Sequence, residues 1–516
     1  MNNWRRVSRS RTRTSDAQPC RPQRPVHTRC VVATALLAAS LLAGCRRSEP
    51  GGAAAARPSA SIILIVIDTL RADHLGCYGY FRETSPRIDA FARQSVVFDR
   101  AYATMATTLP SHTSMLTGLY PLEHGVLANV GNGGAPFHPG PGLRSIVELA
   151  RAAGYRTAAF VSCTPLKRVG GLDVGFETYD TPPGAERNAR QTAGRAIEWI
   201  RQHAGAPLFL FVHFFDPHFP YRPPPKYANL FHTDEALRRF LAQREVPPIV
   251  QPGLCRGRVA TVTAPAVNRY DGEIRFCDHH VGRLLDALRD AGLWETSVIV
   301  LAADHGEGLN QHHWPQHGRT WDEQVHVPLM IHFPASAGVA PRRVGSLVSL
   351  IDVFPTVLGH VESAWASGFL RQARGRNVLS PDFRPRPLLS QRSGRDCGEA
   401  GGPAFVLTTP RWRYHYVSER RGLLFERASD PFELHDVSPS AAEQAAALRR
   451  DLLDLVSALR RRGEALRGGV RQAAPLDSKL MREMQALGYV GDEPEEAEAP
   501  ASRPASVPAA SRPRRP

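Results

Sequence analysis

The sequence predicts an α/β protein built on a mostly parallel β-sheet, and three stretches of the chain carry this prediction. Ser61–Ile67, Leu208–Phe214 and Ser297–Ala303 are nearly continuous apolar runs, which are typical of strands buried on both faces. Segments with apolar residues at helical spacing separate these runs. Strands that alternate with helices form a parallel sheet with helices on both of its faces.

The other elements of the main domain, which we place at residues 61–375, follow in chain order. A helix opens at Ser85-Pro86 and runs to about Ser95, because serine followed by proline favours a helix start. The spacing then predicts a helix over Leu143–Ala153, a strand over Thr157–Val161, and helices over Ala185–His203 and Val267–Ala291. Between Pro223 and about Ala264 the chain bears prolines and shows no periodicity, so we expect an irregular segment that could act as a lid.

After about residue 375 the pattern of the sequence changes. Ala404–Thr408, Arg411–Val417 and Leu423–Glu426 predict short antiparallel strands, and Ala441–Leu466 predicts an amphipathic helix. We therefore expect a smaller α+β subdomain over residues 376–491. Residues 492–516 are rich in Glu, Ala, Pro, Ser and Arg without apolar periodicity, which predicts a disordered tail.

Residues 1–44 predict an export signal. They carry eight arginines and one aspartate, and the apolar run Val31–Ala43 is too short to span a bilayer as a permanent helix. The run ends in Leu42-Ala43-Gly44-Cys45, which resembles the bacterial lipoprotein signal, in which the cysteine is lipidated. Residues 45–60 would form a flexible tether. We expect a periplasmic or surface-facing lipoprotein of the bacterial cell envelope, anchored to the membrane through Cys45.

The net charge of +15 does not indicate a nucleic-acid-binding protein. Nearly half of the excess lies in the export signal, and the remainder is spread thinly over the rest of the chain. The five cysteines beyond Cys45 are scattered without CxxC spacing. This pattern argues against a zinc ribbon and leaves room for one or two disulfides.

Candidate site residues stand where the predicted strands end. Asp68 follows the first strand, Asp216-Pro217-His218 follows the second, and Asp304-His305 follows the third. Ligands of such sheets gather at the carboxyl ends of the strands. Thr108 lies at the start of the predicted short helix TLPSHTSMLTG, where it could serve as an ordinary helix cap or as a nucleophile.

Several ordered motifs resemble the sulfatase branch of the alkaline phosphatase superfamily. They include IVIDTLRADHLGCYGY (65–80), TLPSHTSMLTGLYPLEHGV (108–126), FVHFFDPHFPY (211–221), YDGEIRFCDHHVGRLLDAL (270–288) and ADHGEGL (303–309). The resemblance implies an alkaline-phosphatase-like fold and a divalent metal (Ca²⁺, Zn²⁺, Mg²⁺ or Mn²⁺). It implies Asp68, Asp304, His305 and the Thr108 oxygen as metal ligands. It also implies that His218 and His317 contact the substrate, with His317 placed to protonate the leaving group.

The chain departs from the family at two positions. Sulfatases carry C/S-x-P-S-R, with the Cys or Ser converted to formylglycine, whereas this chain has Thr108 and, in place of the arginine, His112. We expect His112 to contact the substrate. A family segment that grips sulfate is also missing, and the region reads FVSCTPLKRVGGLDVGF (160–176).

The expected activity is metal-dependent hydrolysis of a sulfuric or phosphoric ester by Thr108, on a small anionic, glycan or lipid substrate. A phosphothreonine is released by in-line attack of water, so threonine favours phosphoryl chemistry, whereas the surrounding motifs favour sulfatases. A phosphodiesterase or phosphoethanolamine-type transferase and an inactive, glycan-binding fold remain alternatives. Among neighbouring residues, we expect Arg71 to support the metal loop, and His312 and His313 to lie exposed in a loop.

Overall fold

The computed structural model describes residues 60–130, 134–245, 263–392 and 404–468. The predicted signal, the predicted tether up to residue 59 and the predicted tail therefore lie outside the described residues. Within the described ranges, none of the helices combines the length and the hydropathy that crossing a membrane requires.

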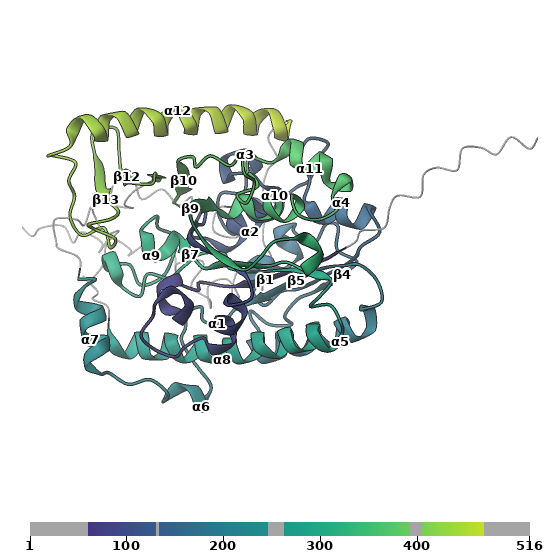
Figure 1. Cartoon of the computed structure of the whole chain (residues 1–516). Coiled ribbons are helices and arrows are strands. Elements are labelled where there is room, and N and C mark those ends of the chain that lie inside the picture. Colours follow the sequence, from purple (N-terminus) through teal and green to yellow (C-terminus); the bar gives the residue numbers. More distant parts are fainter. Residues whose placement is uncertain (1–59, 131–133, 246–262, 393–403, 469–516) are drawn as a thin grey trace, which may run out of the picture. The chain divides into compact units, whose positions relative to one another are not determined.

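A nine-stranded sheet forms the centre of the fold and confirms the predicted fold class (Figure 1). Five of its strands are mutually parallel, in the order β4-β3-β5-β1-β6. β8 continues the sheet antiparallel to β6, and β2 pairs antiparallel with β8 and β7 and parallel with β9. The strands are β1 (Ser61–Ile67), β2 (Val96–Tyr102), β3 (Arg156–Phe160), β4 (Thr178–Asp180), β5 (Leu208–Phe214), β6 (Ser297–Ala303), β7 (His326–Val327), β8 (Leu329–His332) and β9 (Arg342–Ser349).

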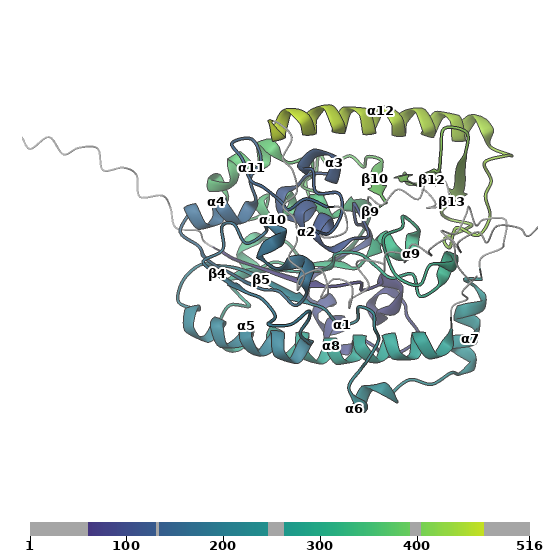
Figure 2. The same cartoon turned by 180° about the vertical axis from the view of Figure 1, so that it is seen from behind.

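Helices cover both faces of this sheet, as the alternating pattern predicts (Figure 2). The long helix α8 packs against α5, α1 and α6 on one side. On the other side α2 packs against α3, α4 and α10. The α-helices are α1 (Pro86–Ala92), α2 (Thr108–Thr117), α3 (Pro121–His124), α4 (Ile146–Ala152), α5 (Ala189–His203), α6 (Pro225–Ala228), α7 (Glu235–Ala242), α8 (Ala264–Asp290), α9 (Asp322–Val325), α10 (Val353–Leu358), α11 (Ser367–Gln372) and α12 (Ala442–Arg467).

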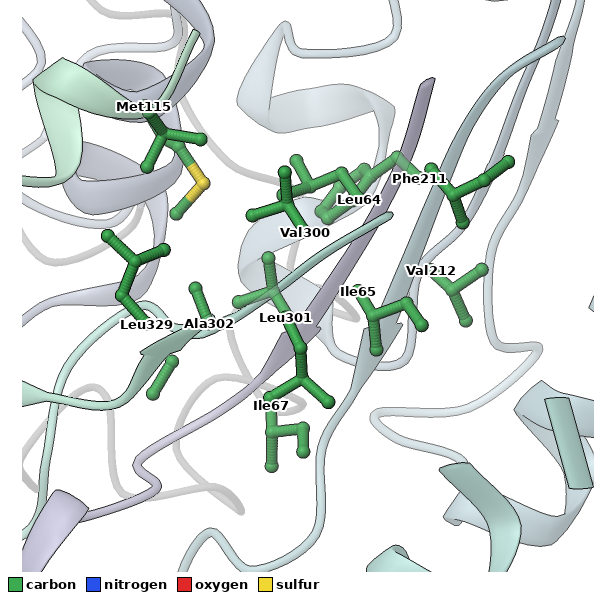
Figure 3. Close-up of a cluster of buried hydrophobic side chains, with 14 of the residues drawn as sticks. Leu64, Ile65, Ile67, Met115, Phe211, Val212, Val300, Leu301, Ala302 and Leu329 are labelled. Carbon is green, nitrogen blue, oxygen red and sulfur yellow. The ribbon is translucent and has the colours of Figure 1, made fainter. Parts of the chain in front are cut away.

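The core lies on the central strands, whose side chains are fully buried on both faces. Figure 3 shows Leu64, Phe211, Val300 and Leu301 of the three central strands together with Met115 of α2. Each fully buried large aliphatic or aromatic side chain stabilises the fold by about 2 kcal/mol. The packing fixes the carboxyl ends of β5, β1 and β6 side by side, and the candidate site residues follow directly after these ends.

A second, four-stranded antiparallel sheet stands close to the C-terminal end of the described chain. Its order is β10 (Leu388–Gln391), β11 (Phe405–Thr408), β12 (Trp412–Tyr416) and β13 (Gly422–Glu426). Helix α12 packs along this sheet and against α3. The three short strands and the long helix expected here are thus present.

Two expectations about secondary structure need correction. The segment from residue 223 to 264 is not wholly irregular, because α6 and α7 lie within it; residues 246–262 are outside the described part. The pattern also missed β2 and β7–β9, which form one side of the main sheet. β2 reads VVFDRAY, where Asp99 and Arg100 interrupt the apolar run, and β7 is only two residues long.

Candidate functional site

Asp68 and Asp304 lie side by side because their strands do. β1 and β6 pair in parallel with Ile67 opposite Ala303, so the residue after each strand leaves the sheet at the same edge. The backbone N–H groups of His305 and Thr69 donate to Asp304 Oδ1 over 2.8 and 3.3 Å. This arrangement fixes the carboxylate and leaves its second oxygen, Oδ2, 3.4 Å from His305 Nε2.

Thr108 is the first residue of α2, and two contacts tie this helix to the acidic edge. Ser111 Oγ donates to the Asp304 carbonyl oxygen over 2.6 Å. The Nδ1 atom of His112 lies 2.7 Å from the Thr108 carbonyl oxygen and 3.6 Å from Asp304 Oδ2. The His112 side chain therefore lies between the Thr108 backbone and the Asp304 carboxylate.

His218 and His317 meet at the same place from two loops. Their Nε2 atoms are 3.1 Å apart, and the ring of His317 lies 4.4 Å from that of His305, measured between centroids. His218 follows β5 and stacks on Phe215. The structure thus gathers Asp68, Thr108, His112, His218, Asp304, His305 and His317, the predicted site residues of the main domain. Cys45 lies outside the described residues.

The tautomers of four of these histidines follow from backbone contacts. The Nδ1 atoms of His112, His218, His305 and His317 face the carbonyl oxygens of Thr108, Phe219, Gly306 and Ala106 at 2.7, 2.5, 3.0 and 3.1 Å. A carbonyl oxygen only accepts, so each Nδ1 carries the ring hydrogen and each Nε2 carries the lone pair. The Nε2 atoms of His218 and His317 then face each other as two acceptors until a proton or a cation comes between them. Each Nε2 can therefore bind a cation or accept a proton.

The two carboxylates at this edge of the sheet, Asp68 and Asp304, are shielded from solvent. Asp68, Asp304 and His305 are fully buried. Burial raises the pKa of Asp68 and of Asp304, the latter further through the charge of Asp68, and it lowers the pKa of His305. Both oxygens of Asp68, Asp304 Oδ2, His305 Nε2 and Thr108 Oγ1 are buried without a hydrogen-bond partner.

These donors fit a divalent cation. One ligand atom each from Asp68, Asp304 and His305 lies within 4.8 Å of the others. Carboxylate oxygens and an imidazole are donors that Ca²⁺, Mg²⁺, Mn²⁺ and Zn²⁺ all accept. A cation at this point would provide the partner that each buried atom lacks, since buried polar groups are almost always paired.

Neighbouring residues bear out one expectation and overturn another. Arg71 supports the loop after β6, donating through Nη1 to the Glu307 carbonyl and through Nη2 to Gln311 Oε1. His312 and His313 are not exposed: only 8% and 9% of their surface is accessible. Backbone at positive φ turns both residues inward, and His312 stacks on Trp321.

Sequence reasoning missed His213 and Cys163. His213 lies on β5 with its Nε2 3.3 Å from Asp68 Oδ2, and Cys163 belongs to a buried group with the same two residues. A histidine inside the otherwise apolar run LFLFVHF was a usable signal. Cys163 gave none, because its approach to Asp68 comes only from the packing of β3 beside β5.

Comparison with known proteins shows the family of the chain. The Sulfatase family matches residues 60–363. An ulvan-active sulfatase of Formosa agariphila is 23% identical over 73% of this chain and 76% of its own length. Among solved structures, yidJ of Bacteroides fragilis, described as a candidate sulfatase, superposes with a TM-score of 0.65 at 18% identity, covering 79% of this chain and 98% of that one.

A phosphonate monoester hydrolase of Agrobacterium radiobacter superposes with a TM-score of 0.57 at 22% identity, over 78% of this chain and 96% of that one. The family match spans more than half of the chain and contains every site residue described above. The chain is therefore a member of the sulfatase family, and with that family it is a hydrolase of ester bonds.

Proposed function

We propose that the protein hydrolyses a phosphoric ester with Thr108 as the covalent nucleophile. The observation that carries the proposal is the position of Thr108 Oγ1. The oxygen is buried without a hydrogen-bond partner at the first residue of α2, the helix that Ser111 joins to the Asp304 backbone. Thr108 is not the cap of the helix, because Thr107 occupies the N-cap position, and neither hydroxyl makes a capping hydrogen bond.

Asp68, Asp304 and His305 are the residues that would hold the divalent cation. When bound, the cation would lower the pKa of the Thr108 hydroxyl and offset negative charge on the transferring group. The first turn of α2 adds backbone N–H groups and the positive end of the helix dipole.

In the first step the Thr108 oxygen forms a bond to phosphorus while the bond to the ester oxygen breaks. In the second step water attacks phosphorus, the threonine–phosphorus bond breaks, and inorganic phosphate leaves. Each step moves one proton, away from the attacking oxygen and onto the departing oxygen. Nothing is oxidised or reduced.

His317 is the group we assign to this proton movement. Burial lowers its pKa to about 4, so the free site holds a neutral ring rather than the acid that the sequence suggested. With its hydrogen on Nδ1, the ring accepts a proton at Nε2, and an anionic ester bound beside it favours the charged form. His218, 3.1 Å away, then stabilises the proton by sharing it.

A threonine nucleophile favours a phosphate ester over a sulfate ester as the substrate. A formylglycine hydrate expels sulfate by collapsing to an aldehyde, but a threonine ester has no such route and needs attack of water at the central atom. The likeness to a phosphonate monoester hydrolase supports the assignment. Two relatives are an ulvan-active sulfatase and an endo-4-O-sulfatase. Their names support an anionic glycan as the molecule that carries the ester.

The test compares substrates and then variants. Metal-loaded protein is assayed with p-nitrophenyl phosphate, bis-p-nitrophenyl phosphate, the p-nitrophenyl monoester of phenylphosphonate and p-nitrophenyl sulfate. We expect the phosphoryl substrates to be turned over fastest. Thr108→Ala should still bind metal through the remaining ligands while losing activity by about 10³-fold or more. Near-normal activity in Thr108→Ala would refute the nucleophile. Transfer to an added alcohol would indicate a transferase, and no turnover of any substrate would indicate a binding protein.

We also propose that the protein is a lipoprotein of the bacterial cell envelope. The support is the sequence of residues 1–45 alone. Labelling of cells with a palmitate analogue should mark the wild-type protein and not a Cys45→Ala variant. Equal labelling of both would rule out this anchor.

A further inference from the structure

Asp68 faces two imidazoles from different strands. Its Oδ1 lies 3.7 Å from Nε2 of His305, which belongs to the cation site described above. Its Oδ2 lies 3.3 Å from Nε2 of His213 on β5. One carboxylate therefore stands between two nitrogen donors, and only one of these donors belongs to that cation site.

Cys163 and His112 lie close to His213. Ligand atoms of Asp68, Cys163 and His213 lie within 4.8 Å of one another, and so do those of His112, His213 and Asp304. All five residues have 1% or less of their surface accessible. Cys163 is a free thiol. The two groups share His213, so they describe one further pocket of donors.

Four atoms of this pocket have no hydrogen-bond partner. They are His112 Nε2, His213 Nε2, Asp68 Oδ2 and Asp304 Oδ2. A buried polar atom left unpaired costs about 1–3 kcal/mol. His112 cannot relieve the cost by changing its tautomer, because its Nδ1 donates to the Thr108 carbonyl. Donors from α2, β5 and the ends of β1, β3 and β6 thus lie around His213 in two overlapping groups.

We infer that this pocket binds a second divalent cation, with His112, His213 and Cys163 as its own ligands and Asp68 bridging to the first cation. Two imidazoles and a thiolate favour Zn²⁺ over Ca²⁺ or Mg²⁺. The inference deepens the proposed function, because it concerns the same site. One divalent cation already balances Asp68 and Asp304, so a second leaves positive charge that suits the dianion of a phosphate monoester.

The other tautomer of His213 would leave the site with one cation. The Ser162 N–H points at His213 Nδ1 over 3.4 Å, a long contact that favours hydrogen on Nε2. In that case His213 would donate to Asp68 and the chain would hold one cation. Binding of a cation at Nε2 requires the hydrogen on Nδ1 and gives up the long contact in exchange for a ligand bond.

Metal content and spectra of the full-length protein distinguish the two. Protein stripped with a chelator is reloaded with Zn²⁺ or Co²⁺, and metal per chain is measured after dialysis. We expect two equivalents and, with Co²⁺, an intense near-ultraviolet sulfur-to-metal band. Cys163→Ser should abolish this band, and His213→Ala should reduce the content to one equivalent. Cys277→Ser, which removes a buried thiol of α8, should change neither.

One equivalent per chain in the wild type, or two equivalents that neither variant alters, would overturn the inference. Thermal unfolding of each variant shows whether it folds. If His213→Ala does not fold, Cys163→Ser, which keeps the shape of the side chain, still tests the inference. The outcome is separate from that of the proposed function, since a one-cation protein that turns over phosphate esters through Thr108 refutes the second cation alone.

Discussion

Glu433 holds the C-terminal sheet to the loop that carries His317, and its removal should destabilise the protein in a pH-dependent way. Its carboxylate is 1% exposed and accepts from Arg413 Nε over 2.5 Å, from His415 Nε2 over 2.6 Å and from the Asp322 N–H over 2.9 Å. Arg413 also donates to the Thr320 carbonyl. β12 is thereby joined to the segment that follows His317.

The expected loss of stability follows from the pKa of Glu433. Burial works against ionisation, but the charge of Arg413 outweighs it and lowers the pKa from 4.5 to about 2. Since one pKa unit is worth about 1.4 kcal/mol, ionisation of this carboxyl contributes about 3 kcal/mol to the free energy of unfolding. The folded pKa lies below the unfolded one, so the contribution is complete above about pH 4.5 and is lost as the pH falls toward 2.

Urea unfolding of wild type and Glu433→Gln at pH 7, 5, 4 and 3 measures this contribution. We expect the variant to be less stable by about 3 kcal/mol at pH 7 and pH 5, with a gap that narrows below pH 4.5. The control is Glu426→Gln on β13, whose partner Arg411 is exposed, and it should cause little change. A gap under about 0.5 kcal/mol at pH 7, or one that widens in acid, would contradict the reasoning.

Four further outcomes are expected. Asp304→Asn should weaken metal binding more than about 100-fold in a chelator competition, because it removes charge from the ligand oxygen that His305 faces. His317→Ala should slow hydrolysis of alkyl phosphates by about 10² or more and that of p-nitrophenyl phosphate much less, because a good leaving group needs no proton. Gly306→Ala should lower stability by about 2 kcal/mol in urea unfolding, because the added Cβ would meet the Glu323 carbonyl oxygen at 2.1 Å. In the same assay Gly194→Ala, in open space within α5, should raise stability by up to about 1 kcal/mol.

The parts of the fold that could be predicted are those whose residues carry a local signal. β1, β5 and β6 match the predicted bounds because apolar strands buried on both faces are bounded sharply by polar residues. β7 and β8 carry no such signal. β8 is four residues long, and the antiparallel pairings of β2 with β7 and β8 join residues more than two hundred positions apart. Tertiary contacts decide such short strands, not local propensity.

The residues of the candidate site also fall into those that the sequence predicts and those that it does not. Asp68, Asp304 and His305 end predicted strands, so chain order and sheet topology place them together before any coordinates are known. His213 lies inside a strand, one residue before its end, and whether its side chain faces the site or a helix depends on the pleat and twist of the sheet. The expectation for His312 and His313 failed for a related reason. A polar, glycine-flanked loop is normally exposed, but here its residues 309–313 adopt positive φ at four positions and fold inward.

The backbone around the site explains why so many histidines can be held neutral and in one orientation. Four carbonyl oxygens, each from a loop or a helix start beside the sheet edge, receive the Nδ1 hydrogens of His112, His218, His305 and His317. Burial lowers the pKa of each of these rings, so none of them is charged before a ligand arrives. The site therefore faces its ligands with lone pairs and carboxylates rather than with positive charge. Because such a surface repels an anionic ester, we expect the proposed cation to be needed for substrate binding and not only for the chemical step.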